Sequence, residues 1–155
     1  MQKILNVKID DISLKEATET LIQWAQNNDQ KYVVTPNPEI ILKAQNNEEY
    51  LKILNKADLS IADGTGILWA SKFLKITENT KHNWLKILKW AISLFLTVIF
   101  PPYIKTVLRE RVTGTDLMQH ICKKCPKGVV KIFLLGAEIG VAEKVKEILE
   151  KKYPN

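Results

Sequence analysis

The segment Leu59-Ser-Ile-Ala-Asp-Gly-Thr-Gly66 runs from a short apolar stretch into a turn with two glycines, and a helical pattern follows it. This order is typical of a buried strand that passes into a helix, with a polar turn at the carboxyl end of the strand. The segments Tyr32-Val-Val-Thr35 and Val129–Leu135 have the same strand character, and helical patterns separate them. Because parallel neighbours need crossover helices, the alternation predicts an α/β fold with a parallel, Rossmann-like sheet and helices on both faces.

The other elements are predicted from capping residues and apolar periodicity. The pattern indicates a strand-like opening at Ile4–Ile9 and helices in the following places: after Ser13 to about Asn27, from Pro38, over Glu48–Lys56, from Thr115 as N-cap to about Lys124, and over Glu138–Lys152.

Length and composition bound the class of protein. A chain of 155 residues fits one domain over residues 1–155, and 46% hydrophobic with 26% charged residues excludes disordered, collagen-like and coiled-coil classes. The net charge of +6 favours an anionic partner, but no basic and aromatic motif points to nucleic acid, so none is expected. Two cysteines give no disulfide framework and no leader pattern opens the chain, so a cytoplasmic location is expected.

An uncharged stretch, Trp90–Ile104, interrupts the strand and helix alternation. Lysines precede it, Lys105, Arg109 and Arg111 follow it, and Pro101-Pro102 ends its helix well short of the ~20 apolar residues that cross a membrane. The segment from about 83 to 104 therefore suits a helix that lies in a membrane interface or dips into one leaflet. The alternative is a core helix or a helix buried in a dimer, and the sequence leaves both open.

Polar residues follow two of the predicted strands, where open parallel sheets bind their ligands. Asp63 could act as a general base beside Gly64 and Gly66, or it could cap the next helix. Thr35 and Asn37 follow the preceding strand, so they are expected near Asp63 as binding residues, or they form only a turn with the flanking prolines.

Two further features are weaker as site signals. The Gly136 to Gly140 turn is either a nucleotide-binding loop or a tight turn, because the third glycine of the dinucleotide motif is missing. Cys122 and Cys125 lack a second ligand pair, so small, partly buried helix residues are expected rather than zinc ligands. No metal site and no cofactor are predicted.

Four motifs, in this order, resemble the WecG/TagA/CpsF family of bacterial glycosyltransferases. They are Thr35-Pro-Asn-Pro-Glu39, Ala62-Asp-Gly-Thr-Gly66, Arg111-Val-Thr-Gly-Thr-Asp-Leu117 and Phe133-Leu-Leu-Gly-Ala-Glu-Ile-Gly-Val-Ala142. The resemblance implies an inverting transfer of N-acetylmannosamine or a related sugar from a UDP-sugar to undecaprenyl-diphosphate-linked N-acetylglucosamine. Such a reaction serves wall teichoic acid or surface polysaccharide synthesis at the inner face of the cell membrane.

The resemblance also suggests roles for the candidate residues. Asp63 would be the base, while Thr35 and Asn37 would position sugar hydroxyls. Arg111 would bind the nucleotide or the lipid diphosphate together with the Gly136 to Gly140 turn, or it would only brace the domain.

Two departures from the family pattern are expected. About thirty residues, roughly 76–107, form an apolar insertion before Arg111, and the family domain continues beyond Tyr153 where this chain stops. An unpaired sheet edge would then favour a homo-oligomer. The alternative to an enzyme is a membrane-bound binding or scaffold module with an incomplete active site.

Overall fold

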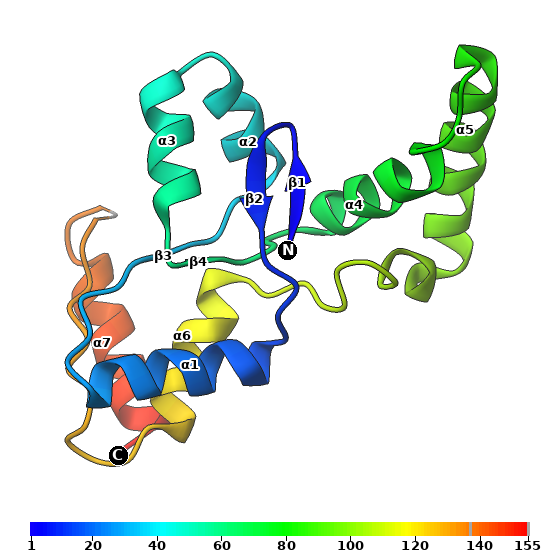
Figure 1. The fold of residues 1–155 in the computed structure, drawn as a ribbon. Coiled ribbons are helices and arrows are strands. Elements are labelled where there is room, and N and C mark those ends of the chain that lie inside the picture. Colours follow the sequence, from blue (N-terminus) through cyan, green and yellow to red (C-terminus); the bar gives the residue numbers. More distant parts are fainter. Residues whose placement is uncertain (137, 155) are drawn as a thin grey trace. The chain divides into compact units, whose positions relative to one another are not determined.

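The computed structural model describes residues 1–136 and 138–154 and has a mixed α/β fold. The chain forms two compact units: unit 1 contains Met1–Ser13 and Lys31–Gly114, and unit 2 contains Leu14–Gln30 and Thr115–Asn155. The elements labelled in Figure 1 are β1 (Gln2–Ile4), β2 (Val7–Ile9), α1 (Leu14–Gln26), β3 (Val33–Val34), α2 (Pro38–Gln45), α3 (Glu48–Lys56), β4 (Leu59–Ser60), α4 (Thr65–Thr77), α5 (Asn83–Ile99), α6 (Gly114–Lys124) and α7 (Val141–Lys152), with a 3-10 helix η1 (Pro101–Ile104) between α5 and α6.

The strand-like opening of the chain is a hairpin. Strands β1 and β2 pair antiparallel, with Ile4 opposite Val7. The two turn residues, Leu5 and Asn6, have φ angles of 44° and 65°. Positive φ at both positions matches the right-handed twist of a two-residue hairpin, and it explains how a single predicted strand region folds back on itself.

The parallel arrangement predicted from the sequence is present at β3 and β4. Val33 lies opposite Leu59 in this parallel pair. On the other side of β4, Asp10 forms a parallel bridge with Ile61, and the Asp10 N–H donates to the Ser60 carbonyl at 2.8 Å. Backbone segments therefore flank β4 on both sides, as expected for a buried strand.

The core of unit 1 lies between these strands and three helices. Helix α3 packs on β2 and α4 packs on β1, as Figure 1 shows on the two sides of the hairpin. The largest fully buried side chains include Ile9, Ile41, Ile61 and Ile67. Each such side chain contributes about 1.5–3 kcal/mol by leaving water, so this cluster fixes the strand ends that carry the candidate site.

Most predicted helices are confirmed, and local caps explain their first residues. Asn37 caps α2 by accepting from the Ile40 N–H at 2.8 Å, and Pro38 occupies the first helical position. Asn47 caps α3 in the same way through the Tyr50 N–H at 2.9 Å. The prediction that Thr115 caps α6 is wrong, because helical backbone already begins at Gly114.

The predicted strand Val129–Leu135 is not formed in the described residues. Unit 2 contains α1, α6 and α7, and Lys152 Nζ on α7 donates to Gln119 Oε1 on α6 at 2.9 Å. Phe133 is 86% exposed. A strand needs a neighbour for its N–H and C=O groups, and the residues of this segment pair with none, so strong β propensity alone does not produce a strand here.

The helix predicted within the apolar stretch is confirmed as α5. It packs on α4 and η1 inside unit 1. Among the described residues, no helix combines the length and apolar character needed to cross a membrane.

Candidate active site

The candidate site lies where β3 and β4 end. The Asp63 N–H donates to the Pro36 carbonyl at 3.1 Å, which joins the loop after β4 to the loop after β3. A Cβ atom on Gly66 would lie 3.0 Å from Pro38 Cγ, closer than carbon atoms ordinarily approach. Only glycine leaves room for this contact, so the Thr35–Glu39 and Ala62–Gly66 motifs lie side by side.

The Arg111–Leu117 motif reaches the same place through its first residues. The Val112 N–H donates to the Ala62 carbonyl at 3.0 Å. A Cβ atom on Gly114 would lie 3.6 Å from Thr35 Oγ1. Three motifs that are far apart in the sequence therefore converge within unit 1, and each contributes backbone to a common edge.

Asp63 is the acidic residue at this edge. It is half-buried, and its carboxylate has no hydrogen bond or ion pair within the described part of the chain. The capping alternative does not hold: the N-cap of α4 is Gly64, with φ 125° and no side-chain cap. An unpaired carboxylate at this edge can accept a proton from a bound hydroxyl group.

Thr35 and Asn37 lie in the loop that contacts Asp63, as the parallel-strand argument predicts. Thr35 is half-buried. The Asn37 Oδ1 atom caps α2, so the turn function is present, while the two amide hydrogens of Asn37 remain unpaired among the described residues. Capping fixes the Asn37 side chain and leaves its donors for a ligand, so the two interpretations of this residue are compatible.

Arg111 and Arg109 behave differently. The Arg109 guanidinium binds Asp11, with Nε 3.0 Å from Oδ2, and the Arg109 N–H donates to Asp11 Oδ1 at 2.8 Å. Arg111 is exposed, and its guanidinium has no partner in the parts of the chain that are described. Arg109 therefore braces unit 1 through Asp11, whereas no bracing contact of the Arg111 side chain occurs among the described residues.

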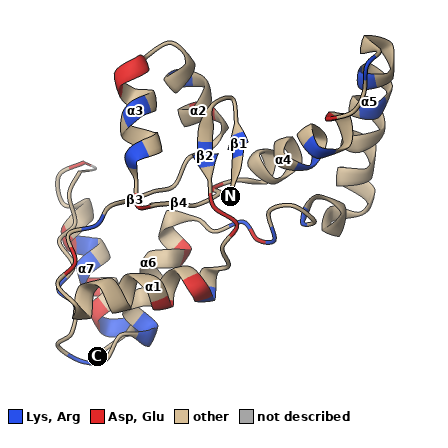
Figure 2. Cartoon of the chain, in the orientation of Figure 1, with Lys and Arg blue, Asp and Glu red and all other residues tan. Residues whose placement is uncertain are grey.

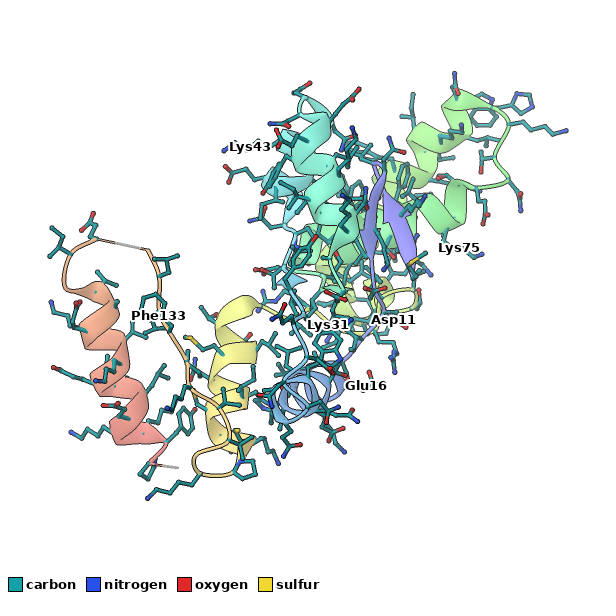
Figure 3. The ribbon with its side chains drawn as sticks, turned by 60° about the vertical axis from the view of Figure 1, so that its left-hand side comes forward. Asp11, Glu16, Lys31, Lys43, Lys75 and Phe133 are labelled. Atoms are coloured by element: carbon teal, nitrogen blue, oxygen red, sulfur yellow. The ribbon has the colours of Figure 1, made fainter. Side chains whose placement is uncertain are left out.

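The Asp10-Asp11 pair escaped the sequence analysis. Asp10 Oδ2 accepts from the Ser60 N–H at 3.0 Å, directly before the loop that carries Asp63. Asp11, labelled in Figure 3, holds Arg109, directly before the loop that carries Arg111. Two consecutive carboxylates after a strand are the signal that could have found this pair, since together they fix both loops of the site.

Gly136 and Gly140 belong to unit 2. Their φ angles are 101° and 84°, both in the left-handed region, and Gly140 is the N-cap of α7. Ala137, within the same motif, lies outside the described residues. The tight-turn property is therefore present, and the site described above is built from unit 1 residues alone.

Unit 2 has a groove of about 390 Å³ between the end of α6, the segment around Phe133 (Figure 3) and α7. Cys122 and Cys125 line it; Cys122 is half-buried on α6, and Cys125 is buried one residue beyond that helix. Burial raises the pKa of the Cys122 thiol above its ordinary value. Cys122 is thus the small, partly buried helix residue expected from the sequence and stays protonated near neutral pH, whereas Cys125 is buried and lies outside the predicted helix.

Comparison with known proteins identifies the class to which this fold and site belong. The chain belongs to the glycosyl transferase WecG/TagA/CpsF family, whose family model matches residues 2–95 and 95–155. The two matches meet inside α5.

Individual relatives agree with the family match. Proteins of Staphylococcus aureus strains NCTC 8325 / PS 47 and COL are 29% identical over 154 residues, which cover 98% of this chain and 49% of theirs. Both are named N-acetylglucosaminyldiphosphoundecaprenol N-acetyl-beta-D-mannosaminyltransferase. The chain therefore spans about half the length of the curated relatives it matches.

Proposed function

We propose that this chain is an inverting glycosyltransferase that moves N-acetylmannosamine, or a related sugar, from a UDP-sugar to undecaprenyl-diphosphate-linked N-acetylglucosamine. The reaction would serve wall teichoic acid or surface polysaccharide synthesis. One observation carries the proposal: three family motifs meet around Asp63, whose carboxylate is unpaired. The family membership and the printed names of the Staphylococcus aureus relatives support it.

In the proposed mechanism, Asp63 is the general base. The acceptor hydroxyl oxygen attacks the anomeric carbon of the donor, its proton passes to the Asp63 carboxylate, and the bond from that carbon to the diphosphate breaks to release UDP. Attack opposite the leaving group inverts the anomeric centre. A positioned base typically accelerates such a step about 10² to 10⁴-fold.

The other site residues would bind rather than react. Thr35 and the Asn37 amide would hold sugar hydroxyls, and Gly64 and Gly66 would let the sugar approach the backbone closely. Positive charge on the departing diphosphate stabilises it, and the exposed guanidinium of Arg111 suits this purpose. Gly136 and Gly140 would contribute backbone N–H groups to the nucleotide from the turn before α7.

The proposal extends to the fold. We place β3 and β4 in a Rossmann-like parallel sheet with helices on both faces, and we treat residues 1–155 as one glycosyltransferase domain. The parallel bridge between Asp10 and Ile61 supports this arrangement, because it places a third parallel segment beside β4. An insertion over residues 76–107 stays a prediction of the sequence, because the two family matches together cover these residues.

The partners of the proposed enzyme are the UDP-sugar, the polyprenyl-diphosphate-linked acceptor and the inner face of the cell membrane, contacted through about 83–104. Membrane contact is consistent with the long apolar side chains exposed on this segment. A homo-oligomer remains a prediction of the sequence.

The test is the substitution Asp63→Asn, which keeps the size of the side chain and removes its basicity. UDP release is measured with a UDP-sugar and a lipid-linked N-acetylglucosamine acceptor, and Asp29→Asn, on an exposed residue of unit 2, is the matched control. We expect Asp63→Asn to lower turnover by about 10² to 10⁴-fold at an unchanged melting temperature. Equal turnover of Asp63→Asn and the control would remove the base from the mechanism, and failure of the wild-type chain to transfer sugar would favour the binding-module alternative.

A further inference from the structure

Helix α5 has its polar face turned inward. Lys89, Ser93 and Thr97 are spaced four residues apart and therefore share one face of the helix. Lys89 Nζ donates to the Ile76 carbonyl and to Thr80 Oγ1, each at 2.8 Å. Ser93 is completely buried. These contacts join α5 to the last turn of α4 and to the loop that follows it, and they fix which face of α5 points away from the protein.

The outward face of α5 is apolar along its whole length. Val98 is 80% exposed, Ile87 66% and Trp84 65%. The large hydrophobic side chains exposed on this helix and its C-cap are Trp84, Ile87, Leu88, Trp90, Ile92, Leu94, Phe95, Val98, Ile99 and Phe100. A surface helix in water shows the opposite order, with its apolar face on the core, and a continuous exposed apolar face marks an interaction surface.

The charges around this face have one sign. No aspartate or glutamate occurs between Asn79 and Arg109, whereas Lys81 and Lys86 lie at the start of α5 and Lys105 follows η1. Figure 2 shows the same pattern, since the ribbon of α5 is blue at basic residues near its start and carries no red. The surface is therefore complementary to an anionic partner with hydrocarbon beside its charge.

We propose that α5 is an in-plane anchor: its outward face enters one leaflet of an anionic bilayer, and Lys81 and Lys105, on either side of α5 and η1, lie at the phosphate groups. This deepens the membrane contact of the proposed function by naming the inserting face and its orientation, and it does not depend on Asp63. The 17 residues of α5 measure about 26 Å, and hydrocarbon can surround only one side because the other side packs on α4.

Charge distinguishes the bilayer from a second copy of this chain. Two copies that met through their α5 faces would bring lysines toward lysines, with no acidic residue between 79 and 109 to pair with them. Lipid phosphates neutralise the same lysines, and basic residues near an anionic membrane add to binding in proportion to their number.

Flotation of the full chain with vesicles tests the proposal. Vesicles of phosphatidylcholine alone are compared with vesicles that also contain phosphatidylglycerol. The variant Phe95→Gln with Val98→Gln changes only exposed side chains of the outward face. The matched control is Leu42→Gln with Ile53→Gln, which changes exposed apolar residues on α2 and α3.

We expect the wild type and the control to float with the anionic vesicles, and the α5 variant to bind at least tenfold more weakly. Lys81→Gln with Lys105→Gln should reduce the preference for phosphatidylglycerol, and salt should weaken wild-type binding. Asp63→Asn should float like the wild type, so a failed mechanism at Asp63 leaves this result intact.

Three results would overturn the anchor. The first is a wild-type chain that does not float, and the second is equal flotation of the α5 variant and the control. The third is a wild-type dimer in light scattering that the α5 variant converts to a monomer while neither binds vesicles, because a second copy would then cover α5.

Discussion

The close approach of Pro38 and Gly66 allows a direct test of how the two loops of the site pack together. In Gly66→Ala, the new Cβ would lie 3.0 Å from Pro38 Cγ, at least about 0.5 Å inside an ordinary carbon contact. Overpacking of this kind costs about 1–3 kcal/mol, and alanine returns up to about 1 kcal/mol as the better helix former. We expect a net loss of about 0.5–2 kcal/mol, measured as a lower urea midpoint.

A double-mutant cycle isolates the contact. Pro38→Ala removes Cγ and Cδ, so Gly66→Ala should cost less in that background, with a coupling of about 1 kcal/mol. Gly64→Ala is the matched control: its Cβ would lie 3.6 Å from Pro38 Cδ, an ordinary distance, and its cost of about 1–3 kcal/mol comes from a φ of 125°. Pro38→Ala should therefore leave the cost of Gly64→Ala unchanged. Equal coupling for both glycines, or none for Gly66, would refute the close approach of the two motifs.

Two further predictions concern the polar contacts that hold unit 1. A hydrogen bond from Lys31 at 2.9 Å lowers the pKa of Asp58 from its ordinary value. The pair therefore stabilises the fold fully at pH values above the ordinary pKa of Asp58. This stabilisation is lost as the pH falls through the lowered pKa. The urea midpoints of the wild type and Asp58→Asn should therefore differ near neutral pH and converge in strong acid, and a constant difference would assign the effect to packing. Asp11→Ala removes the partner of Arg109 and should cost about 1–2 kcal/mol, whereas Asp29→Ala, on an exposed residue, should cost less than about 0.5 kcal/mol in the same titration.

The parts of the fold that sequence reasoning predicts well are those with local causes. Helices α2 and α3 begin where an asparagine side chain can cap the first turn, and Pro38 reinforces the first of these starts. A short β-branched run predicted β3, and a short apolar run before a glycine turn predicted β4. Val129–Leu135 has a stronger run than either of them, yet no strand forms there, because pairing depends on a neighbour that local sequence does not specify.

The candidate site was predictable to the extent that topology controls it. Parallel strands end at the same edge of a sheet, so the sequence alone predicts that Thr35 and Asn37 lie near Asp63. The brace between Asp11 and Arg109 joins residues 98 positions apart, and nothing local marks either as a partner of the other. The same limit applies to Arg111. Bracing was an alternative role for Arg111 in the sequence, and in the structure Arg109 makes the bracing contact.

Helix α4 connects the two proposals physically. Its first turn carries Gly66 against Pro38, and its last turn offers the Ile76 carbonyl to Lys89 of α5. Its 13 residues measure about 20 Å, and a helix of this length resists bending between its ends. In the proposed arrangement, α4 therefore sets how far Asp63 stands from the bilayer surface at α5, and the acceptor has to present its sugar at that height because its lipid tail stays in the membrane.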